Sequence, residues 1–446
     1  MITRQRQVYL ETYGCQMNQA DSQMLRNLLG KAGWKVTEDA AVADLILINT
    51  CAVRQRAEDR VMGRVRHLAR LKHFRPDLRI GLVGCMATHK RRPLLEQLPA
   101  LDLLVGPDSY RRLTEILMRT DSDAFVDLAL DRREKYEGIE PSEPGGLHAF
   151  VPVMRGCDRF CTFCVVPLVR GREKSVPSSE LITQTEKLAA SGTIAVTLLG
   201  QTVNSYRDGG VDFAALLDRI AQIPGLRRIR FTSPHPADFT RGVFEVMARH
   251  SNLCKHLHIP VQSGSNRILA EMKRGHTREE FLALVGLVRE LLGEVSITTD
   301  LLAGFPSETA EEFEETLSLV RQVRFDGAFL FRYSARPGTY AYRKLADDVP
   351  DAEKTRRLRM MIDLQEEISG ERYAQWIGRV VEVLVEGVSR RDPACVRGKA
   401  DDFKTVVLPG GDADVGAVRS VRIARATSHT LIAEGVPDGS TYIHAS

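Results

Sequence analysis

Short apolar strands and amphipathic helices alternate along the middle of this chain. Strands are predicted at residues 149–154, 194–199, 228–232, 255–261, 295–301 and 327–333, and helices at 178–191, 213–221, 241–249, 278–292 and 310–323. Parallel strands need such helical crossovers, so six units in succession favour a parallel sheet that curves into a partial (β/α)6 barrel. In barrels of this kind, ligands bind to the loops that follow the strands. Functional residues are therefore expected on those loops.

The loop after the first of these strands carries three cysteines in a CxxxCxxC spacing, Cys157, Cys161 and Cys164. Three thiolates at this spacing can bind three irons of a 4Fe-4S cluster and leave the fourth iron open to a small molecule with amino and carboxylate groups. The arrangement is typical of radical S-adenosylmethionine (SAM) chemistry. A zinc site would need a fourth ligand in paired spacing, but the next cysteine is Cys254, and His148 precedes the strand.

A second set of three cysteines follows three apolar strands near the start of the chain. Cys15, Cys51 and Cys85 end the segments 8–15, 45–51 and 80–85, and helices are predicted between them at 21–31, 57–71 and 91–98. The carboxyl ends of parallel strands share one edge of an open sheet, so the three thiols are expected to converge and bind a second cluster with an open iron. Cys254 and Cys395 lack partners at ligand spacing, and we interpret them as structural.

The length of 446 residues exceeds the size at which single cores stop growing, so two or three domains are expected. We predict an N-terminal open parallel α/β domain at 1–125, a linker at 126–147, the partial barrel with a helical connector at 148–376, and a small C-terminal β-barrel at 377–446. The 8 cysteines, with no secretory leader and no apolar span, indicate a cytoplasmic protein with reduced thiols and no membrane partner.

The remaining loops of the predicted barrel are rich in amide, hydroxyl and glycine residues. Such groups can hold the carboxylate, ribose and adenine of a nucleoside-like cofactor, although Gly, Ser and Pro are also ordinary turn residues. His256 and His258 share one face of the fourth strand, and we interpret them as packed or hydrogen-bonded core residues. The predicted cofactor-binding residues are Gln201, Asn204, Ser233, Gln262, Ser263, Asp300 and Phe305.

The last part of the chain changes to short alternating strands, predicted at 379–387, 394–399, 404–408, 420–423 and 430–434. Four or five such strands are typical of the small β-barrels that bind oligonucleotides. The net charge of +4 does not itself require a polyanionic partner, so an RNA interface depends on local groups. The candidates are Arg390, Arg391, Arg397, Lys399 and Lys404, with Phe403 as a stacking platform and Arg170 and Arg172 beside the cysteine loop.

Four motifs together resemble the radical-SAM methylthiotransferases, over essentially the whole chain. They are Tyr13–Ser22 (Tyr-Gly-Cys-Gln-Met-Asn-Gln-Ala-Asp-Ser), Asn49–Arg54 (Asn-Thr-Cys-Ala-Val-Arg), Gly84–Ala87 (Gly-Cys-Met-Ala) and Gly156–Pro167 (Gly-Cys-Asp-Arg-Phe-Cys-Thr-Phe-Cys-Val-Val-Pro). The Tyr-Gly-Cys-Gln-Met-Asn form is most similar to the branch that acts on prenylated adenosine in tRNA. The branch that modifies a ribosomal protein typically has Leu-Gly-Cys-Pro-Lys-Asn, which this chain lacks.

The resemblance implies a reaction and its cofactors. Cys157, Cys161 and Cys164 would bind the cluster that cleaves SAM to a 5′-deoxyadenosyl radical, and Cys15, Cys51 and Cys85 an auxiliary 4Fe-4S cluster that carries or donates sulfur. The product would be a 2-methylthio group on N6-isopentenyladenosine, next to the anticodon of tRNA. The C-terminal domain would be of the TRAM type. An electron donor such as flavodoxin and a cluster or sulfur carrier are expected partners of a monomeric chain.

Two alternatives remain open at this point. The first is a methylthiotransferase with another substrate, either threonylcarbamoyladenosine in tRNA or a ribosomal protein side chain. The second is an iron–sulfur electron carrier or RNA-binding scaffold without catalysis. A carrier would be expected to have fully ligated clusters, whereas both sets of cysteines here stop at three.

Overall fold

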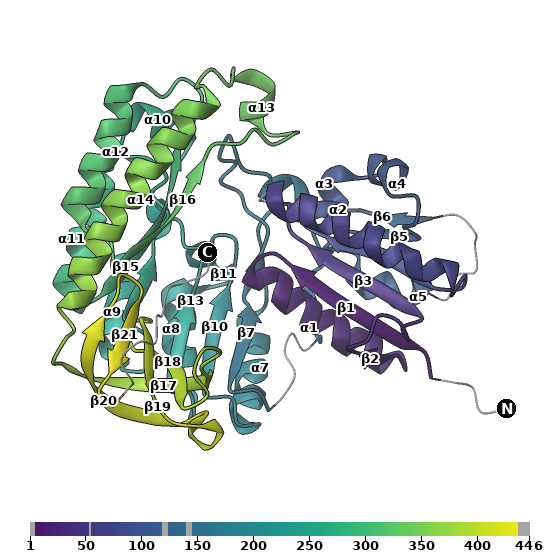
Figure 1. The fold of residues 1–446 in the computed structure, drawn as a ribbon, viewed down its shortest axis with the longest axis horizontal. Coiled ribbons are helices and arrows are strands. Elements are labelled where there is room, and N and C mark those ends of the chain that lie inside the picture. Colours follow the sequence, from purple (N-terminus) through teal and green to yellow (C-terminus); the bar gives the residue numbers. More distant parts are fainter. Residues whose placement is uncertain (1–4, 53–54, 118–123, 140–144, 436–446) are drawn as a thin grey trace.

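The computed structural model describes residues 5–52, 55–117, 124–139 and 145–435 (Figure 1). Val53 and Arg54 of the second cysteine motif, residues 140–144 of the predicted linker and residues 436–446 of the predicted C-terminal domain lie outside this description. In the described part, no helix is both long and apolar enough to cross a membrane.

The N-terminal part is an open sheet of six parallel strands in the order β2-β1-β3-β4-β5-β6. The strands are β1 (Gln7–Tyr13), β2 (Lys35–Thr37), β3 (Leu45–Thr50), β4 (Arg79–Gly84), β5 (Leu103–Val105) and β6 (Phe125–Asp127). The helices are α1 (Gln16–Lys31), α2 (Gln55–Ala69), α3 (Cys85–Lys90), α4 (Pro93–Gln97) and α5 (Leu113–Leu117), with short 3-10 turns η1 (Arg70–His73) and η2 (Tyr110–Arg112).

Helices cover both faces of this sheet, because its central strands are apolar on both sides. All six residues of β3 are buried. On one face, Met24, Leu25 and Leu29 of α1 pack on Leu45 and Leu47. On the other face, side chains of α2 and α4 pack on Ile46 and Ile48. This confirms the predicted parallel α/β domain.

The central part contains six parallel strands that carry the predicted strand–helix alternation. They are β7 (His148–Pro152), β10 (Ala195–Leu199), β13 (Arg228–Phe231), β14 (His256–His258), β15 (Ser296–Ala303) and β16 (Gly327–Arg332). The helices are α6 (Val166–Arg170), α7 (Ser178–Ala190), α8 (Phe213–Ala221), α9 (Arg241–Arg249), α10 (Asn266–Glu271), α11 (Arg278–Leu292), α12 (Ala310–Val323) and α13 (Tyr340–Lys344). Two short hairpins, β8 (Met154–Arg155) with β9 (Lys174–Ser175) and β11 (Arg207–Asp208) with β12 (Val211–Asp212), and the 3-10 turns η3 (Val203–Ser205) and η4 (Pro236–Asp238), complete this part.

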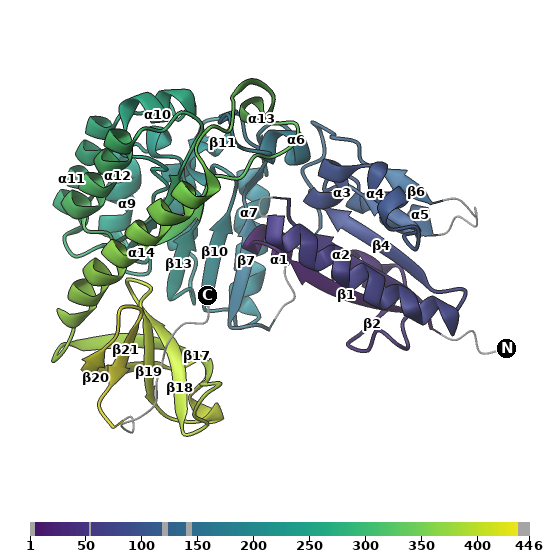
Figure 2. The ribbon, with the colours of Figure 1, turned by 45° about the horizontal axis from the view of Figure 1, so that its top comes forward.

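The six strands form two three-stranded sheets, β13-β10-β7 and β14-β15-β16, rather than one continuous hydrogen-bonded sheet. A single parallel bridge between Ile229 and Leu253 connects them. Both sheets contribute to one large apolar core with the helices outside them. Figures 1 and 2 show the resulting open arc of strands, with the N-terminal domain beside β7.

The C-terminal part is a closed barrel in the order β17-β18-β19-β21-β20. Its strands are β17 (Val380–Val388), β18 (Cys395–Ala400), β19 (Thr405–Pro409), β20 (Val418–Ala426) and β21 (Thr430–Ala433), with the 3-10 turn η5 (Asp412–Asp414). The long helix α14 (Asp351–Ala374) leads into this barrel from the central part (Figure 2). The small predicted β-barrel is therefore confirmed.

The tip of the β18–β19 hairpin docks the C-terminal barrel on the central part. Lys404 is buried and forms ion pairs with Asp326, at 2.9 Å, and with Asp402. The guanidinium of Arg230 and the ammonium of Lys399 both lie over the ring of Phe403, which also contacts His256. These contacts join the hairpin to strands β13 and β14 and to Asp326, which precedes β16.

Candidate active site

The first cysteine loop lies directly after β7 and β8. Cys157 and Cys161 are buried and Cys164 is partly buried. Gly156 has a φ of 79°, and a Cβ at this position would lie 2.0 Å from the carbonyl oxygen of Arg172. Only glycine fits this close approach, which lets the amide of Cys157 donate to the carbonyl of Gly171 at 3.1 Å. The loop is therefore closed by its own backbone.

Each sulfur of this loop accepts one hydrogen bond from the protein. The amides of Arg159 and Val166 donate to the sulfurs of Cys157 and Cys164, both at 3.5 Å. Nη1 of the buried Arg274 donates to the sulfur of Cys161 at 3.3 Å, and its Nε has no hydrogen-bond partner in the described part. Burial raises the pKa of Cys157 to about 11 and that of Cys164 to about 12. Such thiols become thiolates when a metal supplies positive charge, so they fit an iron–sulfur cluster.

The second triad is assembled by three neighbouring strands. Strands β1, β3 and β4 are adjacent, and their registers align Tyr13 with Thr50 and Thr50 with Gly84. Cys15, Cys51 and Cys85 follow within two residues of this row, so all three lie at the carboxyl edge of the sheet, as predicted. A hydrogen bond with Cys51 is the main reason that the pKa of Cys15 is lowered, to about 6. Burial raises the pKa of Cys85.

A polar network fixes the start of α1 against the end of β3. Nδ2 of Asn18 donates to Oδ1 of Asn49 at 3.0 Å, and Nδ2 of Asn49 donates to the carbonyl of Asn18 at 2.8 Å. Both side chains are fully buried. These reciprocal bonds fix the backbone next to Cys15 and Cys51. Asn18 and Asn49 of the two motifs therefore have a structural role.

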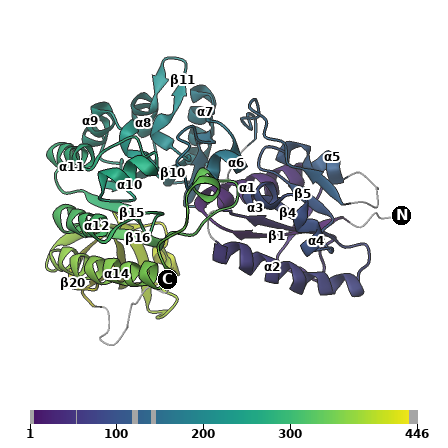
Figure 3. The same ribbon diagram turned by 90° about the horizontal axis from the view of Figure 1, so that it is seen from above.

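The segment that follows Cys164 packs against the second triad. Val165 and Val169 pack on Ala52 and Cys85. Seen from above in Figure 3, α6 lies between the strand arc and the helices α1 and α3 of the N-terminal domain. The segment after the cysteine loop of one domain therefore forms one wall of the cysteine site of the other.

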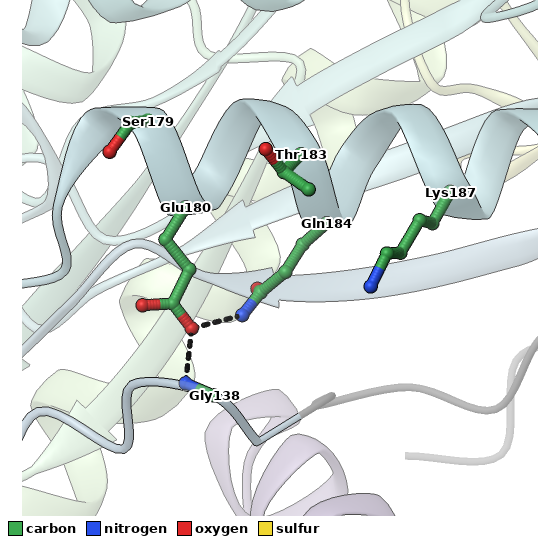
Figure 4. A pocket seen from close by; sticks show the side chains of 6 residues that line it. All are labelled: Gly138, Ser179, Glu180, Thr183, Gln184 and Lys187. Carbon is green, nitrogen blue, oxygen red and sulfur yellow. Dashed lines mark hydrogen bonds between the residues drawn. The ribbon is translucent and has the colours of Figure 1, made fainter.

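Two pockets described at the surface lie apart from the cysteines. One, of about 420 Å³, lies between α7 and Gly138, where the carboxylate of Glu180 accepts from the Gly138 amide at 2.6 Å and from Gln184 at 2.9 Å (Figure 4). The other, of about 520 Å³, lies along α14 near Arg332, Arg356 and Arg359. No cysteine of the two triads lines either pocket.

Comparison with known proteins agrees with this three-part architecture. Residues 7–106 match the model of the uncharacterized protein family UPF0004, residues 151–320 that of the radical SAM superfamily and residues 375–436 that of the TRAM domain. The chain is 45% identical over 428 residues to the tRNA-2-methylthio-N(6)-dimethylallyladenosine synthase of Chloroherpeton thalassium, which covers 95% of both chains. It belongs to this synthase family.

A second member of the synthase family, from Pelodictyon phaeoclathratiforme, is 46% identical over 426 residues, covering 95% of this chain and 97% of the relative. Among solved structures, the radical S-adenosylmethionine methyltransferase TsrM from Kitasatospora setae aligns with a TM-score of 0.55 at 15% identity, covering 76% of this chain and 77% of that one. The likeness to TsrM shows the fold alone. Membership of the radical-SAM group implies an iron–sulfur cluster and SAM as cofactors.

The structure places the predicted cofactor residues in two groups. Gln201, Gln262 and Asp300 are partly exposed and Ser233 is exposed. Oε1 of Gln201 accepts from the amide of Gly156 at 2.5 Å, so this side chain reaches the cysteine loop. Asp300 lies 3.4 Å from Nε2 of His258. His256 and His258 both bond to Thr298 at 3.1 Å, consistent with hydrogen-bonded strand residues.

The side chains of the other three predicted cofactor residues contact other residues of the protein. Asn204 is buried and exchanges two hydrogen bonds with the backbone of His235. Ser263 is fully buried near Thr316, and Phe305 is fully buried against Phe163 and Tyr333. Ser263 and Phe305 thus have no exposed surface for a ligand and support the loops from behind.

Half of the predicted RNA-binding residues face solvent. Arg390, Arg391 and Arg397 are exposed on the β17–β18 hairpin. Arg172 is half exposed, pairs with Asp158 at 2.6 Å and lies over the ring of Phe160. These four residues can reach a phosphate backbone.

The prediction was wrong for Arg170 and Lys404 as phosphate ligands. Arg170 is only 3% exposed and bonds to Asp21 and Cys85 inside the protein. Lys404 is equally buried by Asp326 and Asp402. Phe403 and Lys399 lie against Arg230 and Thr405, and burial lowers the pKa of Lys399 to about 8. Charge in the sequence could not distinguish these interface residues from surface ones.

Three residues near the cysteines were missed by the sequence analysis. Asp21 is fully buried and bonds to both Arg155 and Arg170 at 2.7 Å. Burial alone would raise the pKa of Asp21, but the two guanidinium groups hold it below its usual range. Arg274 was missed because it lies far from the cysteine motif in sequence. The signal available for Asp21 was a charged residue on the face of α1 that also presents Met17, Met24 and Leu25 to the core.

Proposed function

We propose that this chain adds a methylthio group to carbon 2 of N6-isopentenyladenosine next to the anticodon of tRNA. The observation that carries the proposal is the pair of cysteine triads brought together where residues 165–169 pack on Ala52 and Cys85, each triad offering three thiols. The 45% identity over nearly the whole chain to a synthase of this name supports the same substrate. The C-terminal TRAM barrel, with exposed arginines on one hairpin, supports an RNA partner.

We propose a separate 4Fe-4S cluster for each triad, one bound by Cys157, Cys161 and Cys164 and an auxiliary one bound by Cys15, Cys51 and Cys85. When bound, the clusters and SAM would supply the 5′-deoxyadenosyl radical, the sulfur and the methyl group. The chain fixes the distance between the two sites, since Val165 and Val169 pack on Ala52 and Cys85. Cys51, Cys85, Cys157 and Cys161 are buried, which limits the access of water that would quench a radical.

We further propose that Gln201, Ser233, Gln262 and Asp300 contact SAM, with Asn204, Ser263 and Phe305 behind them. Gln201 supports this because it already bonds to Gly156, next to the first cluster ligand. Arg172, Arg390, Arg391 and Arg397 are proposed phosphate contacts to the anticodon stem-loop. Their exposure is what supports this assignment.

The reaction also needs electrons and sulfur from outside the chain. We propose a one-electron donor such as flavodoxin and a cluster or sulfur carrier as partners of a monomeric, cytoplasmic protein. Cysteines that are to bind iron–sulfur clusters must stay reduced, which supports a reducing compartment. We keep the domain bounds 1–125, 148–376 and 377–446 as a proposal, noting that β6 crosses the first bound.

The test is anaerobic reconstitution with iron and sulfide, followed by SAM, a reductant and tRNA that contains isopentenyladenosine. The RNA is digested and examined by mass spectrometry for the 2-methylthio nucleoside, and the small molecules for 5′-deoxyadenosine. Both products are expected. If 5′-deoxyadenosine forms without the methylthio nucleoside, the substrate is wrong, and threonylcarbamoyladenosine tRNA is offered next. If neither forms on cluster-loaded protein, the proposed reaction is wrong.

A further inference from the structure

Each cysteine triad has one buried arginine that donates to a cysteine sulfur. Nη1 of Arg274 donates to the sulfur of Cys161 at 3.3 Å, and Nε of Arg170 donates to the sulfur of Cys85 at 3.2 Å. The two arginines are 6% and 3% exposed. A guanidinium of this kind is a strong, permanently charged donor that suits an anionic sulfur.

Arg170 differs from Arg274 because it connects the two sites. It ends the helix α6, which follows Cys164, yet its side chain reaches the triad of the other domain. Nη2 donates to Oδ2 of Asp21 at 2.7 Å, while Arg155 donates to Oδ1 of the same carboxylate at 2.7 Å. Asp21 therefore fixes the orientation of the guanidinium that lies against Cys85.

One nitrogen of Arg170 remains without a partner. Nη1 is buried and has no hydrogen bond in the part of the chain that the structure describes. Leaving a buried charged donor unpaired is destabilising, so this nitrogen calls for a partner, and a ligand at the site would supply one. The nearest chemistry that would satisfy it is anionic sulfur, because the same guanidinium already donates to the Cys85 thiol.

We propose that Arg170 is a positioning residue for the auxiliary cluster. Its Nε holds the Cys85 thiolate, its Nη1 donates to an anionic sulfur of the cluster or to the sulfur bound at its open iron, and Asp21 keeps both nitrogens in place. This inference rests on the proposed function, because it requires a cluster at Cys15, Cys51 and Cys85. Hydrogen bonds and positive charge near cluster sulfurs raise the reduction potential, so Arg170 makes this cluster easier to reduce.

The first experiment measures the auxiliary cluster alone. Cys157→Ala in the full chain removes a ligand of the other cluster, and the remaining cluster is titrated with a reductant and followed by electron paramagnetic resonance. Adding Arg170→Gln is expected to shift the midpoint to more negative potential and to change the spectrum. Arg241→Gln, which removes an exposed arginine paired with Glu245 on α9, is the matched control and is expected to change neither.

The outcomes separate the two proposals. If Cys157→Ala protein with Arg170 intact binds no cluster, the auxiliary cluster and hence the proposed function fail. If it binds one whose midpoint and spectrum are the same with Gln at position 170, the role of Arg170 is overturned. Should Arg170→Gln fail to fold, Arg170→Lys decides, since lysine keeps the charge but lacks the planar guanidinium whose separate nitrogens reach Cys85 and the cluster at once. With Arg170→Lys, the midpoint potential is expected to shift in the same direction by a smaller amount. An unchanged midpoint overturns the proposal.

A second readout uses the chain with all six cluster cysteines. Arg170→Gln is expected to retain 5′-deoxyadenosine formation while formation of the methylthio nucleoside falls at least about tenfold, the effect of losing one hydrogen bond to a charged group. Arg170→Lys is expected to recover part of the loss. Equal loss of both products from folded, cluster-loaded protein would show that Arg170 serves the fold or the first cluster instead.

Discussion

The two cysteine triads are built in different ways. Cys157, Cys161 and Cys164 lie on one loop, whose shape is set by Gly156 and by hydrogen bonds from its own backbone. Cys15, Cys51 and Cys85 follow three separate strands and meet only when the sheet has formed. The charges beside them also differ, since Arg170 is paired with Asp21 whereas Arg274 has no carboxylate partner in the described part. The first site depends on local geometry and the second on contacts between domains.

The largest expected difference comes from removing one ligand at each site. Cys157→Ala is expected to abolish 5′-deoxyadenosine formation, because this cluster would bind and reduce SAM. Cys51→Ala is expected to abolish the methylthio product but to retain some SAM cleavage. Iron content, 5′-deoxyadenosine and modified nucleoside are measured on each protein. Complete loss of SAM cleavage in both folded variants would contradict separate roles.

Asp21→Asn tests the dependence of the second site on the domain interface. It removes the carboxylate shared by two buried arginines, so the free energy of unfolding is expected to fall by about 3–5 kcal/mol. Denaturant unfolding of the metal-free chain measures this, with the exposed Asp363→Asn on α14 as control. An effect no larger than that of the control would show that the interface does not depend on this ion pair.

The stability that Asp21 contributes through its two arginine partners depends on pH in a defined way. The pKa of Asp21 is held below its usual range in the folded protein, so its contribution to stability is present above the unfolded value of about 3.9 and is lost as pH falls through the lower folded value. Unfolding free energies measured below about pH 4 should therefore fall more steeply for the wild type than for Asp21→Asn. Parallel curves for the two proteins would contradict this.

Gly156→Ala is expected to affect the first site alone. A residue with a side chain at this φ is disfavoured by about 1–2 kcal/mol, and its Cβ would also meet a carbonyl oxygen, so the loop must move. Bound iron per chain is expected to fall by about half, with the auxiliary spectrum unchanged. The matched variant is Gly14→Ala, where a Cβ would lie 2.6 Å from that of Cys51 and the opposite pattern is expected. Loss of both clusters in either variant would show that the sites are not independent.

Arg274→Gln should have the smallest effect. Loss of one hydrogen bond to the Cys161 thiolate is expected to slow SAM cleavage about tenfold and to lower the midpoint of the first cluster. The auxiliary cluster, measured in Cys157→Ala protein, should keep its midpoint. A shift in that cluster would show that the two arginines do not act separately.

Much of the fold could be predicted from sequence, because the strands and helices of the barrel have strong apolar periodicity. All five of the longer barrel helices and all six strands were found, as were the five strands of the C-terminal barrel. Short elements were missed, namely β2, β5, β6, β9, β11, β12, α3, α5, α6, α10 and α13. They span few residues and their stability comes from tertiary packing rather than local pattern.

The cysteines were found for a similar reason, since short spacing and strand-end repetition are visible in one sequence. The roles of charged residues were not. Arg170 and Arg172 stand two positions apart, yet one is buried against Asp21 and the other half exposed beside Asp158. Lys404 and Phe403 carry the features of an RNA contact but dock one domain on another. Such roles depend on which distant residue lies opposite, which no local pattern records.

The shared carboxylate of Asp21 also bears on how the protein is completed during synthesis. Its partners follow 134 and 149 residues later in the chain. At ordinary translation rates, roughly ten to thirty seconds pass before both arginines have been made. Through that interval the N-terminal sheet can form, but a carboxylate without a partner stays in water. The pocket beside Cys85 can therefore close only after the chain has been made as far as Arg170, beyond the first cysteine loop.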